Sequence, residues 1–257
     1  METIIIATTA LFASGLTLFS GFGLGTLLMP VVALFFPVEV AIGITAMVHF
    51  ANNIFKLGLL GLNAHKATVI KFGIPAVISA FAGAFLLGWL SSLQPVFEYS
   101  LMGKTLMVMP VKLIIGILII IFVGLELSPS FSSLTLDRKF LPFGGCISGF
   151  FGGLSGHQGA FRSMFLIKAG LSKEQFIATG VVLAVMVDLS RMIIYGWDAV
   201  VSGKSVEWTL VSVAAISAFV GAFVGVRLMK KMTIRSIQIL VSALLIIVAV
   251  GMISGLI

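Results

Sequence analysis

The residues of this sequence that could do chemistry lie within long apolar stretches. His157, Gln158 and Arg162 follow a glycine-rich run, and Asp188 and Arg191 lie in a later apolar segment. A charge near the centre of a bilayer costs several kcal/mol unless it is paired or hydrated, so its presence there requires a reason. A fixed cation beside two hydrogen-bond donors suits a bound anion. Arg162 is therefore the first candidate for an anion site, the alternative being that it reaches the interface or pairs with a distant carboxylate.

A second group of polar residues lies on two further segments. Asp188 and Arg191 are three residues apart, which places them on one helix face and favours a structural ion pair. Asn53 and Lys56 repeat this spacing in an earlier segment, where an amide replaces the carboxylate, so Lys56 lacks an evident local partner. We predict that the polar face of this earlier segment forms a second wall of the site, made by His49, Asn52, Asn53 and Lys56.

The composition is that of an integral membrane protein. Of the 257 residues, 60% are hydrophobic and only 10% are charged, and the mean hydropathy is +1.22, whereas soluble domains carry about 25% charged residues. The net charge of +7 is explained by the Lys and Arg that gather in cytoplasmic loops. We expect no nucleic-acid partner, because no basic face with interleaved aromatic residues lies outside the apolar segments. The start lacks a signal-peptide pattern, and Cys146 alone allows no intrachain disulfide.

Seven short polar islands separate eight hydrophobic segments, and these segments repeat. Residues 78–85 recur at 216–223 with one difference. At an offset of 135, Ser20-Gly21 corresponds to Ser155-Gly156, Glu39 to Glu174, Asn53 to Asp188 and Lys56 to Arg191. Several matches in order at one offset indicate a four-segment unit present twice. We therefore predict two transmembrane repeats, residues 1–127 and 128–257.

The first segment of each repeat is predicted to be broken. Residues 1–37 would form about 54 Å of helix, which is too long for one straight span and too short for two. Glycines interrupt both segments and leave apolar legs of about half a bilayer, Thr26–Phe36 and Ala160–Ala169. The interrupting glycines are Gly21, Gly23 and Gly25 in the first segment and Gly152, Gly153, Gly156 and Gly159 in the second. We predict two hairpins whose tips lie near the midplane.

The positions of the basic residues favour these hairpins. If each hairpin returns to the face from which it entered, the two repeats have opposite orientations. The basic residues of the loops then share one face, namely Lys66, Lys71, Arg138, Lys139, Lys168, Lys173, Lys230, Lys231 and Arg235. The positive-inside rule makes that face cytoplasmic and places both termini on the non-cytoplasmic side.

Paired breaks in inverted repeats indicate the central site of a transporter. Each returning leg begins near the midplane, where its free N–H groups and positive dipole end can bind an anion. We expect such a cradle at residues 20–25 and 155–159. The alternative is that glycines spaced four apart only allow close helix packing. We prefer packing for Gly221/Gly225, and function for Gly21/Gly25 and Gly149/Gly153.

These features resemble the sulfite exporter TauE/SafE family over nearly the whole chain. The resemblance rests on the duplicated glycine-rich runs at 20–25 and 152–159, and residues 156–163, Gly-His-Gln-Gly-Ala-Phe-Arg-Ser, are typical of one branch. Many members have a proline after the run; Pro30 fits this pattern, but Phe165 departs from it. The resemblance implies transport of sulfite, organosulfonates or related anions across the inner membrane, and leaves import or export open.

The sequence thus predicts an all-α polytopic protein with two inverted repeats that carries a small anion by alternating access. A cation or metal carrier is the first alternative, disfavoured because Asp188 is the one midmembrane carboxylate expected; a carboxylate transporter is another. We expect no enzyme and no cofactor, since His49, His65 and His157 are scattered. Coupling to a proton or ion, and a homodimer, stay open. The predicted substrate-binding residues are Ser20, Gly21, Gly23, Gly25, Asn52, Asn53, Lys56, Ser155, Gly156, His157, Gln158, Gly159, Arg162, Asp188 and Arg191.

Overall fold

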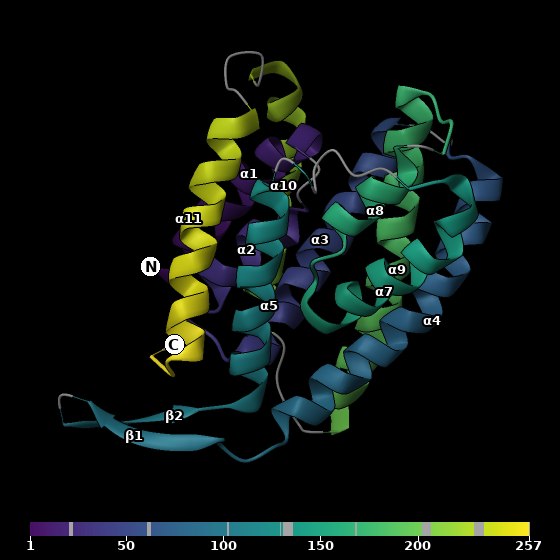
Figure 1. The fold of residues 1–257 in the computed structure, drawn as a ribbon. Helices are drawn as coiled ribbons and strands as arrows, with labels where there is room; N and C mark the ends of the chain where they lie inside the picture. Colours follow the sequence, from purple (N-terminus) through teal and green to yellow (C-terminus); the bar gives the residue numbers. More distant parts are fainter. Residues whose placement is uncertain are drawn as a thin grey trace.

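Helices make up almost the whole chain in the computed structural model (Figure 1). The structure describes residues 1–256 except 21–22, 61–62, 102, 129, 131–135, 168, 202–206 and 229–233, and at some helix ends it describes the backbone alone. The helices are α1 (Glu2–Ser20), α2 (Leu24–Val32), α3 (Val38–Leu60), α4 (Lys66–Ser91), α5 (Pro110–Leu127), α7 (Leu141–Ser155), α8 (Gly159–Leu166), α9 (Lys173–Val201), α10 (Trp208–Leu228) and α11 (Ile234–Ile253), with a 3-10 turn η1 (Arg138–Phe140).

Several helices have the length and composition of membrane spans. Within the described residues, Val38–Gly58, Lys66–Ser91 and Glu174–Gly196 are long and apolar enough to cross a bilayer. Shorter apolar helices cover Glu2–Leu16, Pro110–Leu125, Trp208–Val224 and Ser242–Ile253. A helix forms hydrogen bonds between its own backbone N–H and C=O groups, and lipid offers these groups no other partners. The predicted all-α polytopic membrane fold is confirmed.

Both predicted breaks are present. α1 ends at Ser20 and α2 begins at Leu24, while α7 ends at Ser155 and α8 begins at Gly159. The second break turns at Gly156, whose φ of +81° lies in the left-handed region that glycine adopts without a steric penalty. The returning helices, α2 and α8, are about half as long as a membrane span, as we predicted from the lengths of the apolar legs.

α8 folds back along α7. A Cβ added at Gly144, near the start of α7, would lie 2.3 Å from the ring of Phe165, near the end of α8. Closer to the turn, Ser148 Oγ donates to the carbonyl of Gln158 over 3.0 Å. The end of the returning helix therefore lies beside the start of the entering one, which makes this segment a hairpin.

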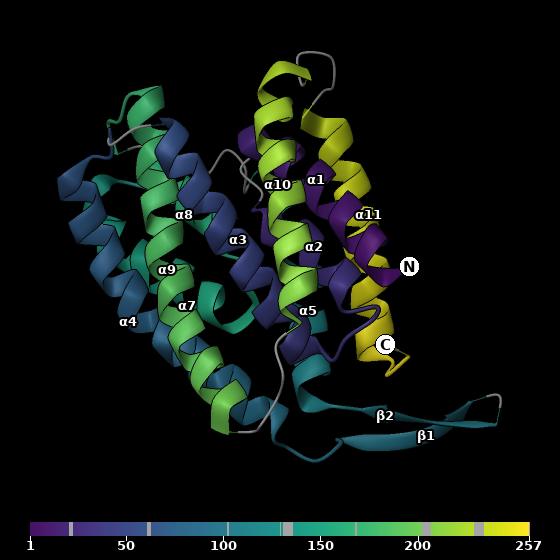
Figure 2. The same cartoon turned by 180° about the vertical axis from the view of Figure 1, so that it is seen from behind.

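Helices α4 and α10 are exchanged between the repeats. α4 packs along α7, and its counterpart α10 packs along α1 (Figures 1 and 2). A Cβ at Gly149 or Gly153 would lie 2.0 or 2.1 Å from a carbonyl oxygen of α4, and one at Gly221 would lie 1.9 Å from the Leu11 carbonyl oxygen. These glycines let two helix backbones touch. The packing role predicted for Gly221 is confirmed, and the functional role preferred for Gly149 and Gly153 was wrong.

The apolar side chains form two separate cores. One is shared by α1, α2, α3, α5, α10 and α11, with the ends of α4 and α7 at its edge. The other is formed by α4, α7, α8 and α9. We call these groups of helices the first bundle and the second bundle; they lie on the left and right of Figure 1.

α3 and α9 meet where the bundles join. Asn53 Nδ2 donates to Asp188 Oδ2 over 3.3 Å, and these residues are 135 positions apart, which is the repeat offset. A twofold rotation exchanges equivalent residues, so equivalent residues can touch only beside the rotation axis. The contact therefore supports a pseudo-twofold axis between α3 and α9.

One element was not predicted. Strands β1 (Phe97–Leu101) and β2 (Lys104–Val108) form an antiparallel hairpin in which Phe97 pairs with Val108. Tyr99 donates its hydroxyl to the carbonyl of Ser254, so the hairpin lies beside the C-terminal end of the chain (Figure 1). α4 and α9 begin at the opposite end of the molecule (Figure 2). Lys66 therefore lies on the face away from the hairpin, as the positions of the basic residues predicted.

Candidate functional site

One face of α3 carries the polar residues toward α9. His49, Asn52, Asn53 and Lys56 follow the spacing i, i+3, i+4, i+7, which keeps side chains on one side of a helix. All four are buried, with exposed fractions of 8% or less. The predicted second wall of the site is therefore a continuous buried polar face.

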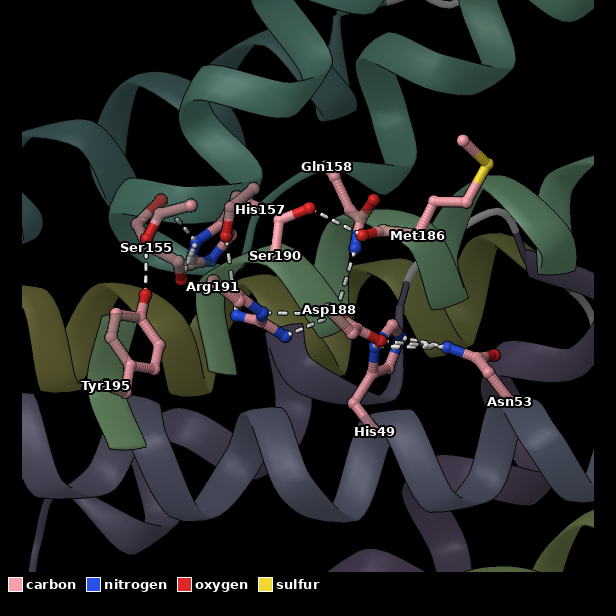
Figure 3. Close-up of polar contacts among 12 residues, drawn as sticks. His49, Asn53, Ser155, His157, Gln158, Met186, Asp188, Ser190, Arg191 and Tyr195 are labelled. Carbon is pink, nitrogen blue, oxygen red and sulfur yellow. Dashed lines mark hydrogen bonds and ion pairs between the residues drawn. The ribbon is translucent and has the colours of Figure 1, made fainter. Parts of the chain in front are cut away.

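Asp188 is the centre of this cluster (Figure 3). Its Oδ1 accepts from Arg191 Nη2 at 2.7 Å and Nε at 3.1 Å, and from Gln158 Nε2 at 3.3 Å. Its Oδ2 accepts from Asn53, and from His49 Nδ1 at 2.6 Å. Asp188 is fully buried, and a buried carboxylate needs such partners. It joins α3, α9 and the second break, and its predicted pair with Arg191 is present.

Side chains of α9 also hold the end of α7. The last carbonyls of a helix lack partners within the helix. Arg191 Nη1 donates to the Gly152 carbonyl over 3.4 Å, and Tyr195 donates its hydroxyl to the Gly153 carbonyl. A Cβ at Gly156 would lie 3.0 Å from Arg191 Nη1, so glycine at the turn also leaves room for the guanidinium.

The second break holds its own polar residues in fixed positions. His157 Nδ1 lies 3.0 Å from the Ser155 carbonyl oxygen and 3.2 Å from Ser155 Oγ. The Phe122 ring of α5 lies against the imidazole, with centroids 5.4 Å apart. Gln158 is the N-cap residue of α8, but its side chain bonds Asp188 and does not cap the helix. The first-turn N–H groups of α8 are left without a side-chain cap.

The two breaks adjoin each other. α2 begins after Gly23 and also lacks a side-chain cap. A Cβ at Gly25, in the first turn of α2, would lie 4.0 Å from the carbonyl oxygen of Gly156 in the second break. A Cβ at Gly23 would lie 3.4 Å from His49 Nε2. The N-terminus of α2 therefore meets the polar cluster. Gly21 and the side chain of Ser20 lie outside the described residues.

Two cations at this place lack a carboxylate partner within the described chain. Arg162, in the first turn of α8, makes its hydrogen bond to a neutral atom, Gln158 Oε1, at 3.4 Å. Lys56 is 8% exposed and has no hydrogen bond or ion pair with any described residue. Lys56 and Arg162 lie close enough for their like charges to repel each other. Since Arg191 already pairs with Asp188, the site has an excess of positive charge.

Three buried polar atoms nearby also lack protein partners. Among the described residues these are Thr45 Oγ1, Asn52 Nδ2 and His157 Nε2. Asn52 Oδ1 accepts from Ser14 Oγ over 3.1 Å, which orients the amide. Buried polar groups are normally satisfied, so unpartnered ones beside a cationic cluster are suited to contact a ligand or water.

The structure brings most predicted site residues to one place. Those it brings together are Gly23, Gly25, Asn52, Asn53, Lys56, Ser155, Gly156, His157, Gln158, Gly159, Arg162, Asp188 and Arg191. Sequence reasoning missed Ser14, Thr45, Ser148 and Tyr195. Tyr195 could have been found, because it lies one turn after Arg191 on the same helix face. Thr45 could have been found in the same way, because it lies one turn before His49 on α3. Ser14 depends on a contact with Asn52, 38 residues away, that spacing does not reveal.

The chain matches one known protein family over most of its length. A family model, Sulfite exporter TauE/SafE, matches residues 6–252. The chain belongs to the sulfite exporter TauE/SafE family. The match covers both repeats, so both helix breaks and all residues of the polar cluster lie within the TauE/SafE region. No curated protein and no solved structure matches the chain. The TauE/SafE family is one of membrane transporters of sulfur-containing anions, and this chain is a multi-pass membrane protein.

Proposed function

We propose that this TauE/SafE member carries a small sulfur oxyanion, sulfite or an organosulfonate, across the inner membrane, and binds it where the two helix breaks adjoin. The observation that carries the proposal is the meeting of the uncapped N-terminus of α2 with a cluster that contains Lys56 and Arg162. Helix N-termini present free N–H groups and a positive dipole end. One bound anion would accept hydrogen bonds from the free N–H groups of α2 and would also balance the charges of Lys56 and Arg162.

The charges of the site disfavour a cation. Lys56, Arg162 and Arg191 stand against one carboxylate, Asp188, whose oxygens are already occupied by donors. Cation sites need free carboxylates, carbonyls or thiolates. A sulfur oxyanion has several oxygens that point in different directions, which suits donors that approach from α2, α3 and α8.

Alternating access requires two bodies that move about a shared site. We infer that these bodies are the first and second bundles, and not the repeats 1–127 and 128–257. The glycine contacts between α4 and α7, and between α10 and α1, bring backbones together and would have to separate if the repeats moved as units. The site lies between α3 of the first bundle and α8 and α9 of the second, which is the place that such a motion would open.

Crosslinks test this assignment of moving bodies. The rings of Phe55 and Phe219 stack within the first bundle, with centroids 4.8 Å apart, whereas Phe122 and Phe161 join the two bundles at 5.5 Å. Each pair is changed to cysteine in a Cys146→Ser background and linked by a short bifunctional reagent. The Phe55/Phe219 link should leave transport intact and the Phe122/Phe161 link should stop it. The opposite result would refute the two bundles as moving bodies.

The membrane orientation follows from the basic residues. Lys66 opens α4 at the end away from the β-hairpin, and η1, with Arg138 and Lys139, packs on α8. We propose that this end is cytoplasmic and that both termini lie on the other side. In a Cys146→Ser background, a membrane-impermeant thiol reagent applied to intact cells should label Glu2→Cys and not Lys139→Cys.

Flux in proteoliposomes tests the function itself. Purified protein is reconstituted, and uptake of sulfite and of methanesulfonate is measured against acetate and against protein-free vesicles. Arg162→Ala removes a charged donor, worth about 1.5–3 kcal/mol, so affinity should fall roughly ten- to hundredfold. Lys56→Ala should weaken affinity less, because an ammonium is a single point charge. Arg138→Ala, in η1, is the matched control and should transport normally.

Two outcomes would reject the proposed function. One is the absence of protein-dependent flux of both sulfite and methanesulfonate. The other is unchanged affinity in Arg162→Ala while that variant is expressed and folded to the level of Arg138→Ala. Flux of acetate alone would show that the substrate is a carboxylate and not a sulfur oxyanion.

A further inference from the structure

His49 connects Asp188 to the first helix break. Its Nδ1 lies 2.6 Å from Asp188 Oδ2. Asp188 is paired with Arg191 and can only accept, so the proton of the neutral imidazole must be on Nδ1. This leaves Nε2 without a proton. Nε2 lies 3.4 Å from the position of a Cβ at Gly23, the residue before α2, and 3.4 Å from the amide nitrogen of Asn53.

We propose that His49 takes up a proton on Nε2 when the anion binds at the first break, so that anion and proton cross together. This inference rests on the proposed function and adds the coupling ion to it. The proton comes from the aqueous side on which the anion enters, and it leaves Nε2 for the opposite side when the anion is released. No other bond forms or breaks.

The charges around His49 explain why anion binding and proton uptake are coupled. Asp188 lies 2.6 Å from the imidazole as a counter-charge, and Arg191 and Lys56 are cations of the same polar cluster that repel an imidazolium. α2 carries no titratable residue, and none of the described side chains of α10 is titratable. An anion beside Nε2 offsets the repulsion by Lys56 and leaves Asp188 to stabilise the imidazolium. By linkage, the proton strengthens anion binding as much as the anion strengthens proton binding.

His157 is less suited to this role. Its Nδ1 faces the Ser155 carbonyl, which also fixes the proton on Nδ1, but within the described residues no carboxylate contacts its ring. Phe122 covers the imidazole. A second positive charge there would lack the counter-charge that Asp188 gives to His49. Of the two histidines at the breaks, the geometry points to His49.

The test compares two kinds of flux in proteoliposomes. Methanesulfonate is the probe, because its sulfonate stays ionised at every pH used; if only sulfite is carried, sulfite replaces it in the same comparison of variants. Counterflow, with unlabelled anion inside and labelled anion outside, needs no net proton movement. Accumulation driven by a pH gradient, with the membrane potential clamped at zero, needs the proton. With one proton per anion, wild type should accumulate the probe about tenfold per pH unit.

His49→Gln should separate these fluxes. It should still catalyse counterflow when the anion is saturating, which also shows that it folds, but with a weaker affinity because the coupled proton is lost. It should lose at least nine-tenths of the accumulation driven by the pH gradient. His65→Asn is the matched control, because His65 caps α4 away from the site and Asn preserves the cap. It should behave as wild type. His157→Gln should keep pH-driven accumulation even if its affinity falls.

A binding measurement on wild type makes the outcome independent of folding in any variant. Methanesulfonate, or sulfite if only sulfite is carried, is added to detergent-solubilised protein in weak buffer with a pH indicator. Protein-dependent uptake of about one proton per bound anion is expected. Wild-type counterflow without pH-driven accumulation or proton uptake would overturn the proton proposal. Full pH-driven accumulation in His49→Gln would overturn the assignment to His49. Absence of any counterflow in wild type would instead reject the proposed function.

Discussion

Asp188 should be the residue whose loss most destabilises the site. It accepts from Arg191, Gln158, Asn53 and His49 and is fully buried. Asp188→Asn keeps the shape but leaves the buried guanidinium of Arg191 without its counter-charge. Breaking one partner of a buried ion pair costs about 3–5 kcal/mol. For a chain of this size each kcal/mol lowers Tm by roughly 2–4 °C, so the expected fall is roughly 6–20 °C.

A double-mutant cycle measures the pair itself. Asp188→Asn, Arg191→Gln and the double variant are purified in detergent, and unfolding is followed by tryptophan fluorescence. The double variant should lose less stability than the sum of the single losses, by about 0.5–3 kcal/mol, because neither buried charge is then left alone. Additive losses would show that the two residues act independently. A Tm unchanged in Asp188→Asn would refute the role of Asp188 as the centre of the cluster.

Three further outcomes follow from the packing. Gly149→Ala places a Cβ 2.0 Å from the Ala76 carbonyl oxygen, and should cost about 1–3 kcal/mol; a Tm equal to wild type would contradict the contact between α4 and α7. Gly88→Ala, on α4, meets nothing within 4 Å and should keep or slightly raise Tm. Gly156→Ala, with φ of +81°, should cost about 1–2 kcal/mol, displace Arg191 and lower anion flux. Normal flux in that variant would show that the turn need not be glycine.

The helix breaks could be predicted because their signal is local. Glycines gather where an apolar stretch is too long for one span, and this occurs at the same place in both repeats. The structure begins the returning helices at Leu24 and Gly159, within two residues of the predicted legs. The offset of 135 also identified Asn53 and Asp188 as equivalents, and the structure places them in contact.

The role of individual glycines could not be predicted from spacing. Glycines four apart occur both where a helix bends and where two helices touch, and the difference lies in what approaches the missing Cβ. Gly149 and Gly153 face the backbone of α4, a segment about 70 residues earlier in the chain. The exchange of α4 and α10 between the repeats is also a tertiary property, since each helix has the same apolar pattern whichever bundle it joins.

The partners of His49 and the β-hairpin were missed for different reasons. The contact of His49 with Asp188 joins residues 139 positions apart, and no local pattern indicates it. The hairpin had a weak signal. Large and polar residues alternate through Phe97–Leu101, and Gly103 supplies a turn with φ of +77°. This signal was missed because the residues belong to a polar island between two predicted spans.

Direct location of the anion tests whether it binds where the two interrupted helices meet. Selenite has the charge and shape of sulfite and carries an atom that anomalous diffraction can identify. Crystals of the protein with ordinary methionine, soaked in selenite, should show one strong selenium peak beside Gly25 and Gly156, in contact with Arg162 and Lys56. The peak should vanish in Arg162→Ala. A selenium peak elsewhere, with none between the two breaks, would contradict the claim that an anion binds where the interrupted helices meet.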